Sequence, residues 1–258
     1  MKTVEISSLA SFHDHVAATG GYHAVFRGEN TATYKLRSKF GRYAAINAER
    51  NTLEIEIRAM QEFKRRAFPF LLQDPGDDWE WLALAQHHGL ATRLLDWTTN
   101  PLVAAYFAMS ESLQDCVIYV FNDAALETWS HDVSPHALAS DHLFYPRHSS
   151  RRIEAQAGLF TVHYHPAKEV DIPSLERWLL KKEMVGDLKS MLRRYGFLCT
   201  SLFPGLDSVC QEIEKTHFWS RSEDDFPTEL RERWKANRLY GLDVPSFKAS
   251  TGQGDKTA

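Results

Sequence analysis

The segment His87–Ala108 reads HHGLATRLLDWTTNPLVAAYFA and joins a dense polar cluster to an apolar stretch. Its first half carries charged, histidine and threonine side chains where a regular period would place core residues. Its second half runs into a predicted helix, Leu102–Met109, whose apolar character on all sides indicates burial. Polar groups between apolar elements must be hydrogen-bonded within the protein or used for a ligand. The segment is therefore predicted to be the functional centre.

Helix signals flank this segment. Asp77 stands three residues before Glu80, which is the spacing of a capping box, and the helix that follows is predicted to stop at Gly89. Asn100-Pro101 predicts the start of the buried helix, because proline suits the first helical position. The polar cluster thus lies between two helices.

Strands and further helices are predicted on either side. Tyr22–Phe26 is a β-rich run that brings Arg27 to its end, where Gly28 permits a sharp turn. Cys116–Phe121 is a continuous apolar run, typical of a buried strand. The other predicted elements are a helix from about Glu49 to Phe68 with Leu53, Ile57, Met60 and Ala67 on one face, a strand Gly158–Tyr164, a helix Leu188–Tyr195, an extended piece Phe197–Thr200, and helices Leu206–Phe218 and Thr228–Leu239.

These elements predict an α+β fold, a single domain with a small central mixed β-sheet flanked by several helices. The domain is expected to span residues 1–245, since no Pro/Gly/Ser-rich linker divides the middle of the chain. Residues 246–258 are expected to form a disordered tail. The region 123–150 is long and irregular, and loops of this length often carry functional residues.

The chain has 258 residues, is 43% hydrophobic and carries a formal net charge of −4. That balance lacks the basic footprint of a dedicated nucleic-acid binder, although a local basic rim around a site stays open. Three scattered cysteines argue against a disulfide framework and fit a reducing compartment. The sequence carries no signal-peptide pattern or membrane-spanning run, so a cytoplasmic protein without a membrane partner is expected.

Motifs of several enzyme classes are missing from the sequence. GxSxG, the P-loop and GxGxxG do not occur, so a serine hydrolase, a kinase and a Rossmann enzyme have no support. His13-x-His15 and His163-x-His165 each direct two rings to one side of a strand, but neither has a third ligand at a familiar spacing. No metal site is predicted.

Individual polar residues allow a ligand role or a structural one. Arg27 at a strand end could clamp a phosphate or carboxylate with two nitrogens, or form an ion pair with a nearby glutamate. Asp96 follows two leucines and is expected to be a buried carboxylate paired with Arg93 or a histidine. Glu154 and Gln156 would face the same side if they sit at a strand edge, and ordinary turn polarity is the alternative.

Four stretches together resemble the FRG-domain family, which is named for the triplet found here as Phe26-Arg27-Gly28. The stretches are FRGE at Phe26–Glu29, WLALAQHHGLATRLLDWTTNPLVAAYFA at Trp81–Ala108, RRIEAQAGLFTVH at Arg151–His163 and SLFPGLDSVCQEI at Ser201–Ile213. The family is bacterial and recurs near mobile elements and phage-defence genes. The resemblance implies a toxin or phage-defence effector.

A further resemblance is to the ordered elements of ADP-ribosyltransferases. Arg27-Gly28 is similar to their first element, Thr98-Thr99-Asn100 to the second, and Glu154-x-Gln156 to the third. The resemblance implies NAD as substrate, cleaved at its nicotinamide–ribose bond. The cofactor-binding residues that it implies are Arg27, Gly28, His87, His88, Arg93, Thr98 and Thr99, and the catalytic residues are Arg27, Asp96, Glu154 and Gln156.

The third element departs from the transferase pattern, which has glutamate at the position of Gln156. An amide brings no negative charge to an oxocarbenium-like transition state. Glu154 or Asp96 would then supply that charge, or the site binds a nucleotide without turnover. Three functions stay open: an NAD-consuming transferase or glycohydrolase, a non-catalytic module that senses a nucleotide or a phage component, and a nucleic-acid hydrolase. A protein or nucleic-acid target also stays open.

Overall fold

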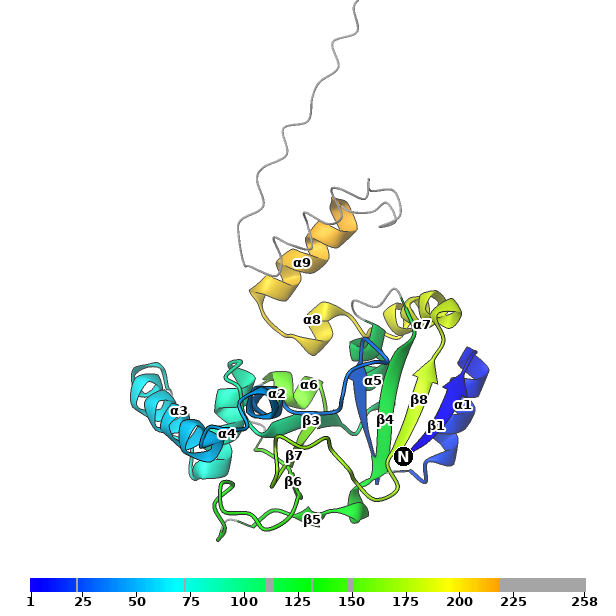
Figure 1. Cartoon of the computed structure of the whole chain (residues 1–258). Coiled ribbons are helices and arrows are strands. Elements are labelled where there is room, and N and C mark those ends of the chain that lie inside the picture. Colours follow the sequence, from blue (N-terminus) through cyan, green and yellow to red (C-terminus); the bar gives the residue numbers. More distant parts are fainter. Residues whose placement is uncertain (22, 72, 110–113, 131, 148–150, 219–258) are drawn as a thin grey trace, which may run out of the picture. The chain divides into compact units, whose positions relative to one another are not determined.

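A mixed β-sheet of eight strands organises residues Met1–Gly205 of the computed structural model (Figure 1). The structure describes residues 1–21, 23–71, 73–109, 114–130, 132–147 and 151–218. Two neighbouring pairs, β1–β8 and β5–β6, are parallel and the others antiparallel. In sheet order the strands are β1 (Lys2–Ile6), β8 (Glu176–Leu180), β4 (Cys116–Asn122), β2 (Ala24–Glu29), β3 (Leu94–Thr98), β7 (Gly158–Val162), β6 (His142–Phe144) and β5 (Glu127–Thr128).

Helices accompany the sheet, which confirms the α+β class. In this unit they are α1 (Leu9–Ala18), α2 (Lys39–Ile46), α3 (Thr52–Ala67), α4 (Asp78–His87), α5 (Pro101–Met109), α6 (Arg151–Ala155), α7 (Lys182–Arg194) and α8 (Cys199–Leu202), with short 3₁₀ turns at Phe68–Phe70 and Asp123–Ala125. The contacts assign α9 (Leu206–His217) to a second unit that starts at Leu206. None of the helices in the described ranges has the length and apolar character that crossing a bilayer requires.

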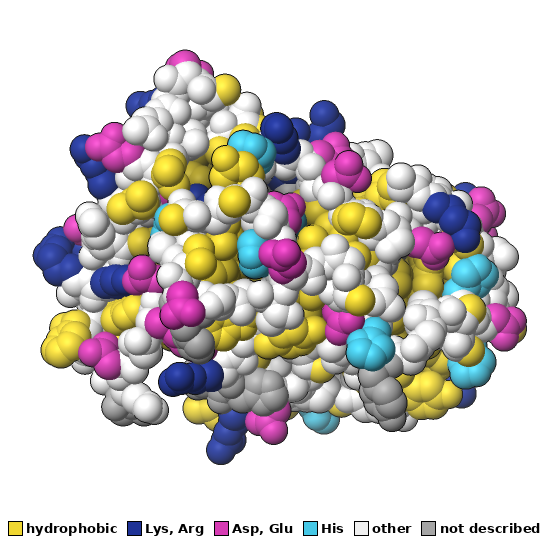
Figure 2. All heavy atoms as spheres, turned by 90° about the horizontal axis from the view of Figure 1, so that it is seen from below, with side chains coloured by type: hydrophobic (Ala, Val, Ile, Leu, Met, Phe, Trp, Pro, Cys, Tyr) yellow, Lys and Arg dark blue, Asp and Glu magenta, His cyan; other side chains and the backbone are white. Residues whose placement is uncertain are grey.

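Apolar clusters join the helices to the sheet. Phe26, Ala104 and Trp178 belong to the cluster between the central strands and helices α1, α5 and α7. Trp79 and Phe144 belong to another, which joins α3 and α4 to strands β3, β7 and β6, and both helices lie on that side of the sheet in Figure 1. On the face of the molecule shown in Figure 2, acidic, basic and histidine side chains are interspersed among apolar ones.

The predicted helix boundaries around the central segment are confirmed. Asp77 Oδ1 accepts hydrogen bonds from the backbone nitrogens of Trp79 and Glu80, at 3.0 and 2.9 Å. Gly89 follows α4 with φ of 85°, a left-handed conformation that favours glycine. Asn100 Oδ1 caps α5 by accepting from Leu102 N at 2.9 Å. These ends are set by local chemistry that the sequence displays.

Other predicted elements need correction. Arg27 lies within β2 and not at its end, because the strand continues to Glu29 along β4. Glu154 lies in helix α6, so it does not sit at a strand edge with Gln156. The extended piece expected at Phe197–Thr200 is wrong in its second half, since helix α8 begins at Cys199.

The apolar face predicted for the long helix is also wrong in part. Helix α3 buries Met60 together with Glu56, whereas Leu53 is 43% exposed. The predicted helix Thr228–Leu239, the boundary at residue 245 and the tail 246–258 lie outside the described residues, and the domain span stays a prediction.

Candidate functional site

Arg27 and Asp96 meet where strands β2 and β3 separate. The two strands are paired at Phe26 and Thr98 alone in the described register, whereas each follows its other neighbour along its length. Arg27 Nη1 donates to the backbone oxygen of Asp96 at 2.7 Å and lies 3.7 Å from Asp96 Oδ2. The splayed strands thus leave a strand carbonyl free to bind a guanidinium.

Arg27 also has a structural partner, which confirms the ion pair with a nearby glutamate, whereas its ligand role stays a prediction. Its Nε and Nη2 donate to Glu29 Oε1 at 2.9 and 2.6 Å. Residues i and i+2 of a strand share a face, which explains the contact. Glu29 fixes the guanidinium plane at the pocket described below and offsets its charge.

Asp96 is not the buried carboxylate that the sequence suggested, since its side chain is 60% exposed. Gln86 Nε2 donates to Asp96 Oδ2 at 2.9 Å, and Thr92 Oγ1 donates to Gln86 Oε1 at 2.6 Å. This relay holds one carboxylate oxygen in place and leaves the group accessible to solvent. Asp96 can therefore accept hydrogen bonds from a ligand in an oriented position.

A pocket of about 180 Å³ opens beside this pair. Cations dominate its charged lining, with Asp96 as the carboxylate among the residues around it. The lining residues are Arg27, Arg37, Lys39, Arg42, Gln86, Gly89, Leu90, Leu94, Leu95 and Asp96. An anion is the ligand that this charge pattern favours.

The start of helix α2 positions the pocket's other cations. Ser38 caps the helix by accepting from Gly41 N at 3.0 Å, and its side chain is buried. Phe40 is buried in turn, and its backbone nitrogen donates to Thr92 O at 3.1 Å. This anchoring fixes the backbone that carries Arg37 and Lys39, which the sequence analysis missed. The sequence shows these cations only as closely spaced residues, and the packing of α2 is needed to gather them at one pocket.

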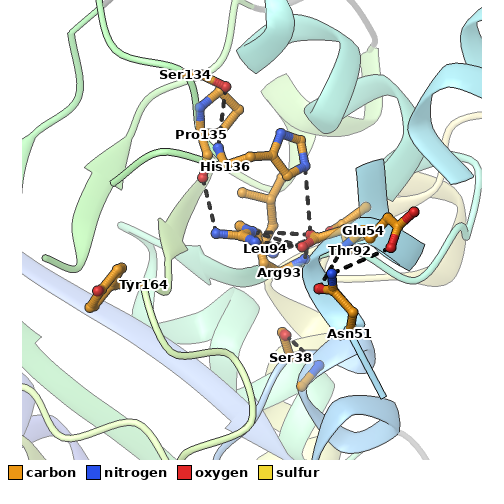
Figure 3. Close-up of polar contacts among 12 residues, drawn as sticks. Ser38, Asn51, Glu54, Thr92, Arg93, Leu94, Ser134, Pro135, His136 and Tyr164 are labelled. Atoms are coloured by element: carbon orange, nitrogen blue, oxygen red, sulfur yellow. Dashed lines mark hydrogen bonds and ion pairs between the residues drawn. The ribbon is translucent and has the colours of Figure 1, made fainter. Parts of the chain in front are cut away.

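Arg93 belongs to a buried polar network, the structural alternative left open for this segment (Figure 3). Its guanidinium is 3% exposed and bonds both carboxylate oxygens of Glu56, which is 2% exposed, at 2.6 to 3.1 Å. Arg93 Nη1 donates to Pro135 O at 3.1 Å, and His136 Nε2 lies 4.0 Å from Glu56 Oε1. The network ties α3 and the 134–136 loop to the start of β3, and leaves Arg93 no open surface for a cofactor.

His136 makes this network sensitive to pH. Burial lowers the pKa of His136 below its ordinary 6.5, against the opposing effect of Glu56. The unfolded state therefore gains a proton at higher pH than the folded state, and stability is full above about pH 6.5 and falls as pH drops below it. Urea unfolding at several pH values between about 5 and 8 is expected to show a shallower acid loss in His136→Gln.

The matched control for that measurement is His13→Gln, an exposed position on α1. It is expected to keep the wild-type slope. Equal slopes for wild type and His136→Gln would remove His136 as a cause of acid sensitivity.

Thr98 and Gln156 form a second pair, next along β3. Thr98 Oγ1 donates to Gln156 O at 2.7 Å and accepts from Asn100 N at 3.0 Å. Gln156 Nε2 donates to Leu202 O at 3.0 Å. Thr98 is buried, and it shares a strand face with Asp96, about 7 Å away along the strand. These bonds give Thr98 and Gln156 a structural role beside the pocket and not in its lining.

Three further predicted residues, Thr99, His87 and His88, lie outside the pocket lining. Thr99 is exposed, and its nitrogen donates to Ala157 O at 3.1 Å. The rings of His87 and His88 lie 5.0 Å apart, edge to face. Burial lowers the pKa of His87, assisted by the charge of Arg152 and by His88. The histidines thus lie near Arg152 at the end of α4.

Glu154 and Gly28 occupy positions that the sequence prediction did not foresee. Glu154 is exposed on α6 and does not line the pocket. Gly28 faces helix α5, and a Cβ atom on it would lie 1.9 Å from Ala104 O and 2.5 Å from Ala108 N. The close approach of α5 therefore explains this glycine, and a turn or a ligand is not needed for it.

The hydrogen-bonded chain Asp141–His163–Thr161, in which His163 and Thr161 are buried, has the residue types of a hydrolase relay. Asp141 Oδ2 and His163 Nδ1 are 2.8 Å apart, and His163 Nε2 and Thr161 Oγ1 are 2.7 Å apart. Thr161 also accepts from Trp97 Nε1 at 2.9 Å and is fully buried, so no substrate reaches it. Among the described residues, no three His, Cys, Asp or Glu side chains gather as a metal site requires.

Together these features define an α+β protein with a cation-lined pocket at the splayed strands of a mixed sheet. Residues 22–116 match the family model of the FRG domain, which supports the FRG-domain family predicted from the sequence. The matched range contains every residue that lines the pocket, whereas Glu154 and Gln156 lie outside it. No curated protein and no solved structure matches the chain.

Proposed function

We propose that this chain binds a nucleotide, with NAD as the first candidate, and that its phosphates occupy the pocket beside Arg27. The observation that carries the proposal is the contact between Arg27 and Asp96 in the wall of a pocket that three further cations line. An arginine fork held by a second residue is suited to a phosphate group. The exposed carboxylate beside it is suited to the hydroxyl groups of a ribose.

The size of the pocket supports partial enclosure of such a ligand. Its volume of about 180 Å³ is below the roughly 300–1,000 Å³ typical of pockets that bury a drug-sized molecule. A dinucleotide would therefore place its phosphates inside and its bases outside, on the surrounding surface. His87 and His88, at the end of α4, remain the proposed contacts for the outer part.

Cleavage of the nicotinamide–ribose bond is the second candidate, and the position of Asp96 favours it. In that reaction the bond electrons leave with the nicotinamide nitrogen, and water or a target nucleophile attacks the ribose carbon. A carboxylate near the developing oxocarbenium ion stabilises it. Asp96 is the carboxylate of the pocket lining, so of the two residues that the sequence left open for this charge, Glu154 and Asp96, the proposal takes Asp96.

Arg27→Gln is expected to weaken NAD binding roughly ten- to hundredfold, since a hydrogen bond to a charged group contributes about 1.5–3 kcal/mol. Arg27→Lys is expected to bind NAD with an affinity between those of wild type and Arg27→Gln, because lysine keeps the charge and lacks the two-pronged guanidinium. Isothermal titration calorimetry with NAD measures the effect, and thermal unfolding without ligand shows whether each variant is folded. Arg58→Gln, an exposed position on α3, is the control and should bind like wild type.

The same samples separate binding from turnover. Mass spectrometry after incubation detects nicotinamide and ADP-ribose. A parallel incubation with a nucleic-acid substrate, with and without a chelator, tests the nucleic-acid hydrolase, for which a requirement for a metal ion is expected. Binding without product supports the sensing module, and product that disappears in Asp96→Asn supports the enzyme. No binding of NAD by folded wild-type protein would remove NAD as the candidate, and no binding of any nucleotide tested would overturn the proposal.

The family resemblance adds a biological role, which we include in the proposal. A bacterial toxin or phage-defence effector of this kind would deplete NAD or modify a protein or nucleic-acid target in the host cytoplasm. Loss of cellular NAD upon expression, relieved by Arg27→Gln, would support that role.

A further inference from the structure

Three of the four cations at the pocket have no acidic partner among the residues that the structure describes. Arg27 is balanced by Glu29, as described above. Lys39 Nζ donates to Gly89 O at 2.7 Å, and Arg42 Nη1 donates to Arg37 O at 3.0 Å. Backbone carbonyls satisfy hydrogen bonds without neutralising charge. Within the described part of the chain, Arg37, Lys39 and Arg42 therefore leave an uncompensated positive charge at one pocket.

Arg37 also has an unmet hydrogen bond. Its Nε atom is buried and has no hydrogen-bond partner among the described residues. Buried donors in folded proteins are nearly always paired, so an unpaired one requires an explanation. Because this atom is closed to solvent, a ligand oxygen in the adjoining pocket supplies the missing acceptor only when the Arg37 side chain turns toward the pocket.

The cations are held in place by the fold. The cap at Ser38 and the burial of Phe40 fix the backbone on both sides of Lys39. Arg37 and Arg42 are joined to each other through the Arg37 carbonyl. Preorganised charges of one sign bind a concentrated opposite charge more strongly than a dispersed one.

We infer that the ligand of this pocket carries a terminal phosphomonoester, bound by Arg37, Lys39 and Arg42. A phosphomonoester carries about −1.5 to −2 charges at neutral pH and three acceptor oxygens. The two phosphates that link the halves of NAD form a pyrophosphate, and each of them carries less charge than a phosphomonoester. The inference rests on the proposed function and refines it, because it predicts that NADP, whose additional phosphate is a monoester, binds better than NAD.

Calorimetric titration of the full chain with four compounds tests the inference. NADP is compared with NAD, and AMP with adenosine, so that each pair differs by one phosphomonoester. At least a tenfold preference for NADP over NAD is expected, decreasing as salt is added. A preference for AMP over adenosine alone would also support the inference, with a 5′-phosphate as the source. No preference in either pair would overturn it.

Variants locate the effect on the protein. Arg37→Gln and Arg42→Gln are each expected to reduce the phosphate preference about tenfold or more, while Arg37→Lys retains part of it. Lys35→Gln is the matched control, because Lys35 is exposed two residues before Arg37 and does not line the pocket. An unchanged preference in both Arg37→Gln and Arg42→Gln would contradict the assignment.

The outcome also distinguishes this inference from the proposed function. Binding of NAD that depends on Arg27, without any preference for a phosphomonoester, would leave the proposed function standing and remove the inference alone. Absence of binding by all four compounds would remove both.

Discussion

Glu56→Leu is expected to lower the free energy of unfolding by about 3–5 kcal/mol, because it leaves the Arg93 guanidinium buried without its counter-charge. Both partners are almost fully buried, so solvent screens the pair little. A loss of that size is a large part of the roughly 5–15 kcal/mol that stabilises a typical domain. Urea unfolding at neutral pH, with the slope compared between variants, measures it.

The double variant Glu56→Leu/Arg93→Met distinguishes two causes of the lost stability, the unpaired charge of Arg93 and the missing contact between the two side chains. Removing both charged groups ends the penalty of the single change, so the double variant is expected to recover most of the lost stability. Arg58→Met, at an exposed pair on the same helix, is the control and should cost less than about 1 kcal/mol. A single variant that matches this control would contradict the account.

The same network has a consequence for the pocket. Arg93 directly precedes β3, and Thr92 beside it starts the relay through Gln86 to the Asp96 carboxylate. The two features therefore share one stretch of backbone. Glu56→Leu, if it stays folded, is therefore expected to weaken ligand binding, although Glu56 does not line the pocket.

The sequence predicted those elements whose ends are decided locally. The caps at Asp77 and Asn100 act within three residues, and the apolar run of β4 needs no partner to be recognised. Strand β8 was not predicted, since its five residues are mixed in character and depend on pairing with β1 and β4. Helix α6 was missed because five residues are too few to display a helical period.

The candidate site also contains residues that the sequence could predict and residues that it could not. The sequence singled out Arg27 and Asp96, which the structure joins, because polar residues beside apolar runs stand out. The sequence could not distinguish Asp96 from Arg93, which lies three positions earlier. Arg93 forms a buried ion pair and Asp96 lines an open pocket, and this difference depends on which distant segments pack against each residue. Arg37 and Arg42 were missed because only the packing of α2 turns spaced cations into a cluster.

Gly28→Ala is expected to lower the free energy of unfolding by about 3 kcal/mol or more. The added methyl group would meet the backbone of α5 at Ala104 and Ala108, and backbone atoms cannot move aside by changing rotamer. Helix α5 is buried in the core cluster, so the helix itself has to shift. Overpacking of a core costs about 1–3 kcal/mol, and a clash with a buried helix backbone belongs at the upper end.

Gly186→Ala is the control for this change, since it adds the same methyl group to an exposed position of α7 with no atom within 4 Å. It is expected to raise stability by about 0.5–1 kcal/mol, as alanine does inside a helix. The comparison also decides why the FRG triplet has its glycine. If Gly28 served ligand approach, Gly28→Ala would weaken NAD binding and leave urea unfolding unchanged, whereas close packing of α5 requires the loss of stability whether or not a ligand is present.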